Sequence, residues 1–323
     1  MQESLNSVSS IRKTNETLDL LGRRIRKNGV YEPFKIMQIE LLKFDVLKKE
    51  CPANPGIDSE SRKKTEEYGV KNQTNEKNGT PQTPSGDKKI DLPGNVKLEL
   101  VKVEAGTFTM SAKAGENIPD EVPHRVTLTK DFFIGRTEVT QAQWKAVMGS
   151  NPSFFKGDDL PGENVSWNDA MSFCEKLNSS GKASNGWKFT LPTETQWEYA
   201  ARGGKKSKGY KYSGSNKADD VAWYRYNSEL KTHPVGQKIA NELGLYDMSG
   251  NVLEWCLDDW NDNSSKQKAE FTRGNDSDSS ERMNRGGDWG RTDKGCRAAI
   301  RINNFPGSRL NTLGFRVVLI QVQ

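Results

Sequence analysis

Cysteine, histidine and long apolar runs are scarce in this sequence, and each shortage excludes a class of protein. Only four cysteines and two histidines occur among 323 residues, and their wide, irregular spacing excludes a disulfide scaffold and a zinc ribbon. No stretch of about eighteen apolar residues is present, so we predict no membrane-spanning segment. The first residues are not followed by the apolar core of a signal peptide. The sequence therefore encodes no export signal, and cell-surface display would require a different start of the chain.

The charge distribution argues against a nucleic-acid partner. The net charge is +5 at pH 7 and charged residues make up 28% of the chain, but Lys and Arg alternate with Asp and Glu. This alternation indicates a solvated surface rather than a nucleic-acid-binding face. Hydrophobic residues reach only 33%, so part of the chain is expected to lie outside any packed core.

Composition divides the chain into three segments. Residues 1–51 contain one periodic apolar stretch, 34–47, which predicts an amphipathic helix. Residues 52–95 are rich in Pro, Gly, Asn, Ser, Thr and Lys and nearly free of aliphatic side chains, so we predict a flexible linker. Aromatic residues concentrate in residues 96–323, which are predicted to form the folded domain.

The elements expected within that domain are short. Residues 96–110 alternate apolar and polar side chains, as a strand and hairpin do. Three helices are expected to begin at Thr140, Ser166 and Thr193, whose hydroxyl groups can cap a helix N-terminus. Residues 314–319 predict a closing strand. Few helices, short strands and much loop indicate an α+β domain.

Eight sequence motifs occur in a fixed order within residues 96–320. They are VEAGTFTM (103–110), PHRVTLTKDFFIGRTEVTQAQW (123–144), PGENVSWNDAMSFCEKL (161–177), LPTETQWEYAARGG (191–204), GLYDMSGNVLEW (244–255), RGGDW (285–289), CRAAIR (296–301) and LGFRVV (313–318). Together they resemble the formylglycine-generating enzyme family, also called the sulfatase-modifying factors. The resemblance implies an α+β, C-type-lectin-like fold with small twisted antiparallel sheets, few helices and long loops. Since that family includes copper-dependent oxidases, iron-dependent sulfoxide synthases and non-enzymatic binding proteins, function has to be argued from the site.

The copper chemistry of the family needs two tail cysteines five residues apart, because two thiolates bind Cu(I). Cys296 matches the second cysteine, but the position five residues earlier is Arg291, which supplies no thiolate. Cys174, Cys256 and Cys296 are expected to be small buried side chains. We therefore predict no copper and no catalysis, with an enzyme of this family with altered chemistry, or a structural accessory domain, as alternatives.

The iron chemistry of the family needs three histidine ligands, and the chain has only His124 and His233. Each lies next to a proline, and we expect both to be scaffold or turn residues. A serine nucleophile turn and a phosphate-binding glycine loop are also missing from the sequence.

A structural calcium ion is the one cofactor that the resemblance implies. Family members bind it through a side chain, two backbone carbonyls and a glutamate, and these positions carry over to Asp247, Gly250, Val252 and Glu254. A hard cation prefers such oxygen ligands. The alternative is that Asp247 caps the turn and that Glu254 pairs with a nearby arginine.

The tail from 285 to 316 resembles the variable proteins of diversity-generating retroelements, in which template adenines are randomised, mostly in Asn codons that end in a pyrimidine. Such codons reach Asn, Asp, Gly, Arg, Thr, Ile, Phe, Ser and Leu, but not Lys, Glu, Gln, Met or Trp. The residues between the scaffold positions belong to the reachable set, with Lys294 as the exception. The expected ligand-binding residues are Asp288, Gly290, Arg291, Thr292, Ile300, Ile302, Asn303, Asn304, Phe305, Ser308, Leu310, Asn311 and Thr312.

These patterns predict a non-catalytic ligand-binding protein that displays a variable surface, residues 288–312, as a target of such a retroelement. A loop fixed at both ends can change sequence without unfolding the core. Apolar loop residues and one arginine are expected to contact the ligand, an unidentified protein or glycan. The scaffold residues Arg285, Trp289, Arg297, Gly314 and Phe315 are expected to hold the segment in place.

Overall fold

The computed structural model describes residues 86–111, 121–261 and 281–322. The predictions for residues 1–51, including the helix at 34–47, and for residues 52–85 lie outside this part of the chain. Within it, no helix is both long enough and apolar enough to cross a membrane.

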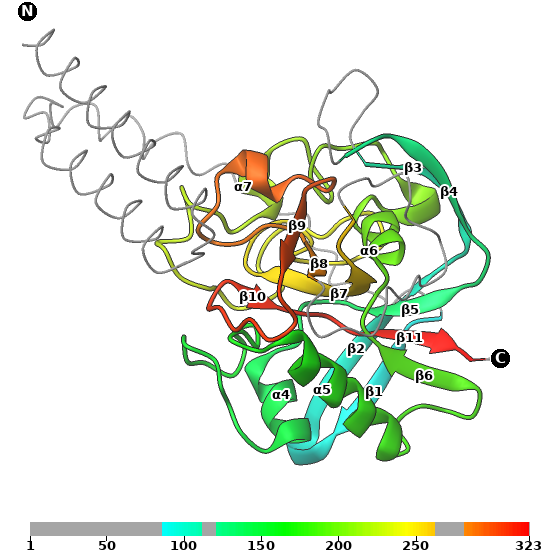
Figure 1. The fold of residues 1–323 in the computed structure, drawn as a ribbon, viewed down its shortest axis with the longest axis vertical. Coiled ribbons are helices and arrows are strands. Elements are labelled where there is room, and N and C mark those ends of the chain that lie inside the picture. Colours follow the sequence, from blue (N-terminus) through cyan, green and yellow to red (C-terminus); the bar gives the residue numbers. More distant parts are fainter. Residues whose placement is uncertain (1–85, 112–120, 262–280, 323) are drawn as a thin grey trace, which may run out of the picture. The chain divides into compact units, whose positions relative to one another are not determined.

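A five-stranded sheet begins with strand β1 (Lys88–Leu92) and has the order β1-β2-β5-β11-β6 (Figure 1). The other strands are β2 (Val96–Val103), β5 (Phe132–Gly135), β11 (Val318–Gln321) and β6 (Trp187–Thr190). Neighbouring strands are antiparallel throughout.

The linker prediction was wrong for the residues that form β1. This strand pairs along its whole length with β2, from Lys88 opposite Leu100 to Leu92 opposite Val96. A short 3₁₀ turn, η1 (Pro93–Asn95), connects the two strands. Only Ile90 and Leu92 in β1 are apolar, and both pack against the core. A stretch with only two apolar side chains among charged residues has the composition of a linker. The sequence therefore predicted a domain start at residue 96, whereas the first strand begins at Lys88.

A second sheet has the order β10-β7-β8-β9 and carries most of the tail. Its strands are β7 (Leu253–Asp259), β8 (Arg282–Arg285), β9 (Arg301–Asn304) and β10 (Leu313–Gly314). The pairs of β7 with β8 and of β8 with β9 are antiparallel, whereas β10 and β7 run parallel. The predicted closing strand at 314–319 is therefore two strands, β10 and β11, in different sheets.

The predicted hairpin at 96–110 is also divided between sheets. β3 (Gly106–Met110) does not pair with β2 but with β4 (His124–Leu128), and these two form a separate antiparallel sheet. The alternation of side chains identified both strands correctly. It could not identify their partners, because strand pairing is set by tertiary contacts.

The three expected helices are confirmed. They are α4 (Gln141–Met148), α5 (Trp167–Ser179) and α6 (Glu194–Ala201), and their N-caps are Thr140, Ser166 and Thr193. In each, the cap hydroxyl accepts a hydrogen bond from the third helical N–H, while the side chain at that position accepts one from the cap N–H. Such a capping box satisfies two donors that a helix end would otherwise leave unpaired. Two shorter turns, η2 (Gly204–Lys206) and α7 (Ala218–Val221), follow.

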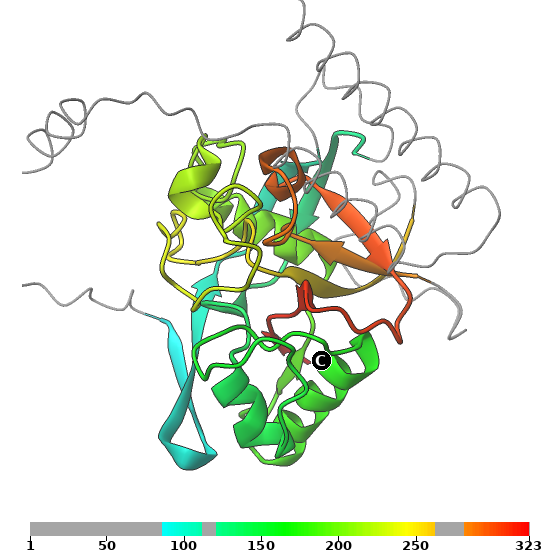
Figure 2. The ribbon, with the colours of Figure 1, turned by 90° about the vertical axis from the view of Figure 1, so that its left-hand side faces the viewer.

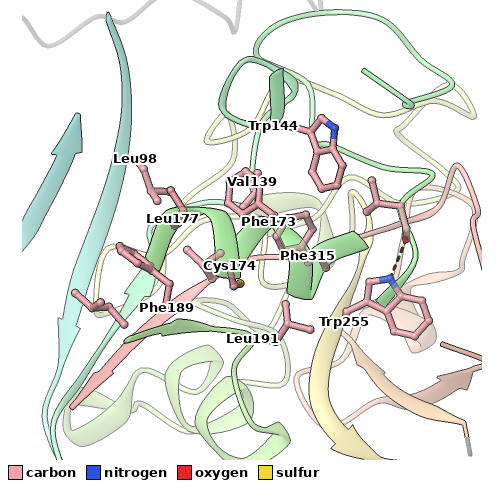
Figure 3. Packing of buried hydrophobic residues seen from close by; sticks show 14 of the residues in the cluster. Leu98, Val139, Trp144, Phe173, Cys174, Leu177, Phe189, Leu191, Trp255 and Phe315 are labelled. Carbon is pink, nitrogen blue, oxygen red and sulfur yellow. Dashed lines mark hydrogen bonds between the residues drawn. The ribbon is translucent and has the colours of Figure 1, made fainter. Parts of the chain in front are cut away.

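One aromatic cluster fixes the end of the tail to the helices (Figure 3). Trp144 of α4 stacks on Phe173 of α5 with 5.7 Å between ring centroids, and Phe315 meets both rings edge-on. Below them, the indole of Trp255 donates a hydrogen bond to the Val165 carbonyl at 3.0 Å. The chain between β9 and β10 runs between α5 and the four-stranded sheet, as both ribbon views show (Figures 1 and 2).

Candidate binding surface

The tail begins on a buried arginine. Arg285, at the end of β8, is fully buried, and its guanidinium contacts the Glu198 carboxylate of α6. It also donates hydrogen bonds to the carbonyl of Ala299, at 2.8 Å, and to that of Ile300. One scaffold side chain therefore ties both ends of the 286–300 loop to the same helix, which is the role predicted for Arg285.

Two glycines then let the chain turn against that scaffold. Gly286 and Gly287 have φ values of +95° and +79°, a region that other residues rarely adopt. A Cβ atom on Gly286 would lie 3.1 Å from the Trp197 ring, and one on Gly287 would lie 2.3 Å from the Gly295 carbonyl oxygen. The two glycines of the RGGDW motif are thus required, because any larger residue would collide with the segments that pack against this turn.

Trp289 joins the two halves of the tail and is half-buried. Its indole donates a hydrogen bond to the Asn311 carbonyl at 3.0 Å, and its backbone carbonyl accepts one from the Ser228 hydroxyl at 2.8 Å. The edge of its ring meets Phe155 with 5.8 Å between centroids. Trp289 therefore holds residues 288–292 beside residues 310–312, the expected scaffold role.

Cys296 lies in the small 3₁₀ turn η4 (Asp293–Cys296) and is fully buried in an apolar cluster with Tyr212 and Tyr224. Burial, and then the nearby Asp288 carboxylate, raise the pKa of the Cys296 thiol. The Arg291 side chain lies over Gly295, and its Nε donates to Asp288 Oδ2 at 2.9 Å. An enclosed, protonated thiol beside a cation is a poor soft-metal ligand and a poor nucleophile.

Cys174, Cys256 and both histidines have structural surroundings, whereas Cys51 lies outside the described residues. Cys174 and Cys256 are buried, and burial raises the pKa of each thiol. His233 stacks on Trp223 with 3.8 Å between ring centroids, and its Nε2 lies 2.8 Å from the Ser228 carbonyl. His124 starts β4, and its Nδ1 lies 2.9 Å from the Val122 carbonyl. In the described parts of the chain, no three His, Cys, Asp or Glu side chains group in a way that could hold a metal ion.

The expected ligand-binding residues form two groups. The first surrounds Trp289, and here one prediction was wrong: Asp288 is only 4% exposed and serves as the partner of Arg291. Arg291 itself is exposed. The half-buried members of this group are Gly290, Thr292, Asn311 and Thr312.

The second group follows β9 and the loop after it. Phe305 is 53% exposed, whereas Ile302 and Leu310 are half-buried and pack against the main core. The Asn303 amide donates to Glu281 and the Asn304 amide to Asn284. Ile300 and Ser308 are half-buried. Ile302 and Leu310 therefore support the surface as well as contribute to it.

Of the other scaffold positions, Arg297 is half-buried, whereas Gly314 and Phe315 are buried. Arg297 makes two hydrogen bonds with the Glu121 carboxylate, at 2.8 and 2.7 Å. Phe315 has no exposed area, and a Cβ atom on Gly314 would lie 2.6 Å from the Gly162 carbonyl oxygen.

The candidate calcium ligands lie in a buried acidic cluster that already contains a cation. Arg316 donates to both oxygens of Glu254, at 2.6 Å each, and the Trp197 indole donates to Oε2 at 2.7 Å. Asp247 Oδ2 accepts the Gly236 N–H at 2.7 Å, and burial raises the pKa of Asp247 to about 6.

Because Glu254 is paired with Arg316, only three of the four predicted ligands are available to a calcium ion. They are the carbonyls of Gly250 and Val252 and the carboxyl group of Asp247. Calcium takes six to eight oxygen ligands. The residues therefore fit a calcium ion poorly in this arrangement, and the arginine pairing considered as the alternative for Glu254 is the one present. Calcium binding stays a prediction.

Sequence reasoning missed three exposed apolar side chains on two loops whose neighbouring residues, Phe155 and Ser228, contact Trp289. They are Phe154, Tyr226 and Leu230, with exposed fractions of 66%, 71% and 41%. All three lie in loops without helical or strand periodicity. The sequence did contain one signal for them, namely aromatic residues within polar loop sequences. Exposing such a side chain to water is unfavourable, so its presence in a loop indicates a contact surface.

The chain belongs to the sulfatase-modifying factor enzyme 1-like domain family, whose model matches residues 91–320. It is 39% identical over 237 residues to the chaperone protein LppX of Paenibacillus barcinonensis, covering 59% of this chain and 78% of that protein. It is 28% identical over 243 residues to the inactive C-alpha-formylglycine-generating enzyme 2 of Bos taurus, covering 68% and 70%.

A solved structure, Treponema denticola variable protein 1, matches with a TM-score of 0.63 and 31% identity, covering 72% of this chain and 98% of that one. These similarities confirm the expected family and the α+β, C-type-lectin-like fold with few helices. The family match begins inside the segment predicted as linker, in agreement with β1.

Proposed function

We propose that this protein is a non-catalytic binding protein whose ligand surface is formed by exposed and half-buried residues between 288 and 312. The observation that carries the proposal is the separation of roles within the tail. Arg285, Arg297 and Phe315 are held by buried partners, while Arg291, Phe305 and the residues beside them face outward. A surface of this kind can change its side chains while the supporting contacts stay the same.

The absence of a usable thiol pair supports a role without catalysis. The tail holds one cysteine, Cys296, which is buried and has a raised pKa. The position that would supply a second thiolate is Arg291. A relative of this chain is named as an inactive formylglycine-generating enzyme, and another as a chaperone protein. Both names agree with binding rather than oxidation.

The proposal includes diversification of the surface by a retroelement. Its support is the set of residue types in the tail and the similarity to a protein named variable protein 1. We expect the DNA near this gene to contain a reverse transcriptase gene and a near-repeat of codons 285–316 that differs at template adenines. Sequencing the locus tests this, and a complete genome without either feature would contradict it.

An assay for oxidase activity tests the other part of the proposal. We expect no formylglycine from the purified full chain with copper, oxygen and a peptide that carries a Cys-x-Pro-x-Arg motif. Mass spectrometry of the peptide detects the aldehyde. Aldehyde above the no-protein background, lost in Cys296→Ser, would show that the protein is an enzyme.

A further inference from the structure

Exposed apolar side chains flank the tail on two loops that lie outside residues 288–312. Phe154 belongs to the loop after α4, and Tyr226 and Leu230 belong to the loop after α7. Their exposed fractions are 66%, 71% and 41%. Large apolar side chains with so much exposed area suggest contact with a partner when they gather in one place.

Contacts with Trp289 and Arg291 place both loops against the same part of the tail. The Phe154 ring meets the Phe155 ring with 5.0 Å between centroids, and Phe155 meets Trp289 at 5.8 Å. From the loop after α7, the Ser228 hydroxyl donates to the Trp289 carbonyl and the Arg225 N–H donates to the Arg291 carbonyl, both at 2.8 Å. Thus Trp289 contacts both loops, and Arg291 contacts the loop after α7.

Hydrogen bonds and ring contacts fix the conformation of both loops. The buried Glu163 carboxylate accepts the Phe155 N–H at 2.8 Å, and the Gln141 amide donates to the Phe155 carbonyl at 2.9 Å. In the other loop, the Tyr224 hydroxyl donates to Asp219 at 2.9 Å, and its ring meets the Tyr226 ring edge-on. Rings presented on fixed loops lose little conformational entropy on binding, which favours affinity.

Arg291 completes the group. Its Nε is used by Asp288, at 2.9 Å, while its two terminal nitrogens have no partner within the described residues. The side chain is 41% exposed. The guanidinium is therefore oriented by a buried carboxylate and presents its outer N–H groups to solvent, where they can bind a second carboxylate.

The geometry points to a constant anchor for the ligands of this protein: Phe154 and Tyr226 bind an apolar patch on a folded protein. Arg291, one of the variable residues, lies beside this anchor and binds a carboxylate next to the patch. This inference rests on the proposed binding function. The residues of 288–312 then adjust specificity around an anchor that different ligands share.

A protein ligand fits this group better than a glycan. The Leu230 side chain offers neither a hydrogen-bonding atom nor a ring that could stack on a sugar, so it needs an apolar surface opposite it. The contacts also come from three separate segments of the chain, which suits a broad interface rather than a small sugar. Aromatic side chains and arginine are the residues that contribute most at protein–protein interfaces.

The test uses the full chain on the surface of yeast. A library randomises Thr292, Phe305, Ser308, Asn311 and Thr312, and clones are selected separately against ovalbumin, serum albumin and dextran. Phe154→Ala, Tyr226→Ala and Phe154→Leu are then introduced into three protein-binding clones with different tail sequences. Val322→Ala is the control, because that apolar side chain is 43% exposed but follows β11.

We expect each alanine variant to raise Kd about tenfold or more in every protein-binding clone, with a smaller effect of Phe154→Leu and none of Val322→Ala. Melting temperatures should stay within about 2 °C of the parent, because both rings are mostly exposed. Kd values within twofold of the parent would overturn the inference while leaving the binding function intact.

Other outcomes also decide the question. Clones selected only on dextran would overturn the assignment to a protein ligand. A dimer of the full chain that Phe154→Ala converts to a monomer, seen by light scattering, would make this surface an interface between copies instead. If no target yields a clone, the proposed binding function fails, and the anchor fails with it.

Discussion

Removing the Arg316 guanidinium should destabilise the domain strongly. This side chain has no exposed area and donates to Glu254, to the Gly135 carbonyl at 2.9 Å and to the Tyr246 carbonyl at 2.9 Å. In Arg316→Met, Glu254 would keep only the Trp197 indole, and a buried carboxylate would lose its cation. Asp247 and Glu138 lie close enough to add repulsion.

The expected cost follows from the burial of both partners. Removing one member of a buried ion pair typically costs about 3–5 kcal/mol, because the other charge stays desolvated. For a domain of this size, each kcal/mol shifts the melting temperature by roughly 2–4 °C. Arg316→Met should therefore lower Tm by about 6–20 °C.

Arg309→Met is the matched control. Arg309 is also in the tail and also pairs with a carboxylate, Asp169, but its side chain is 52% exposed. Exposed pairs contribute at most about 1 kcal/mol, so Tm should fall by less than about 4 °C. Thermal denaturation followed by circular dichroism measures both variants. A similar small shift for the two would refute the structural role assigned to Arg316.

Further predictions concern pH, calcium and the tail. Burial raises the pKa of Glu163 to about 7, above its unfolded value near 4.5. Between pH 5 and 8 the folded state therefore binds more protons at Glu163 than the unfolded state does, so the free energy of unfolding falls as pH rises through this range. Glu163→Gln should flatten this pH dependence in urea titrations. The calcium prediction requires that EDTA lower Tm and that Asp247→Ala abolish this sensitivity; identical melting curves with calcium and with EDTA would contradict it. Ile302→Ala should lower the free energy of unfolding by about 1–3 kcal/mol, because Ile302 packs on the core. Phe305→Ala should change it by no more than about 0.5 kcal/mol, because this side chain is exposed. Equal losses for the two variants in chemical denaturation would show that Phe305 is a core residue.

Local signals in the sequence predicted the features that depend on a few neighbouring residues. Thr140, Ser166 and Thr193 became helix caps because a hydroxyl three residues before an amide side chain or carboxylate can satisfy two backbone donors. The order of the eight motifs identified the family, and with it the scaffold role of Arg285 and Phe315. These features need no knowledge of distant partners.

The features that the sequence could not supply depend on partners far along the chain. Strand β1 is stabilised by β2, and its own charged composition conceals it. Asp288 looked like a surface residue until the structure placed it in a buried position opposite Arg291. For Glu254 the sequence offered a calcium ion, implied by the family resemblance, or a nearby arginine as partner, and only the structure shows that Arg316, 62 positions later, donates to both of its oxygens.

The most direct test of the central claim is the tolerance of the tail to sequence change. One yeast library randomises exposed or half-buried positions, namely Arg291, Thr292, Phe305, Ser308 and Asn311. A second randomises the buried residues Met283, Ala298, Phe315 and Val317.

Resistance of displayed full chains to protease, followed by sequencing of the survivors, measures the folded fraction of each library. The account predicts that most clones of the first library survive and that few of the second do. Equal, low survival of both libraries would show that residues 288–312 are part of the core and contradict their role as a variable binding surface.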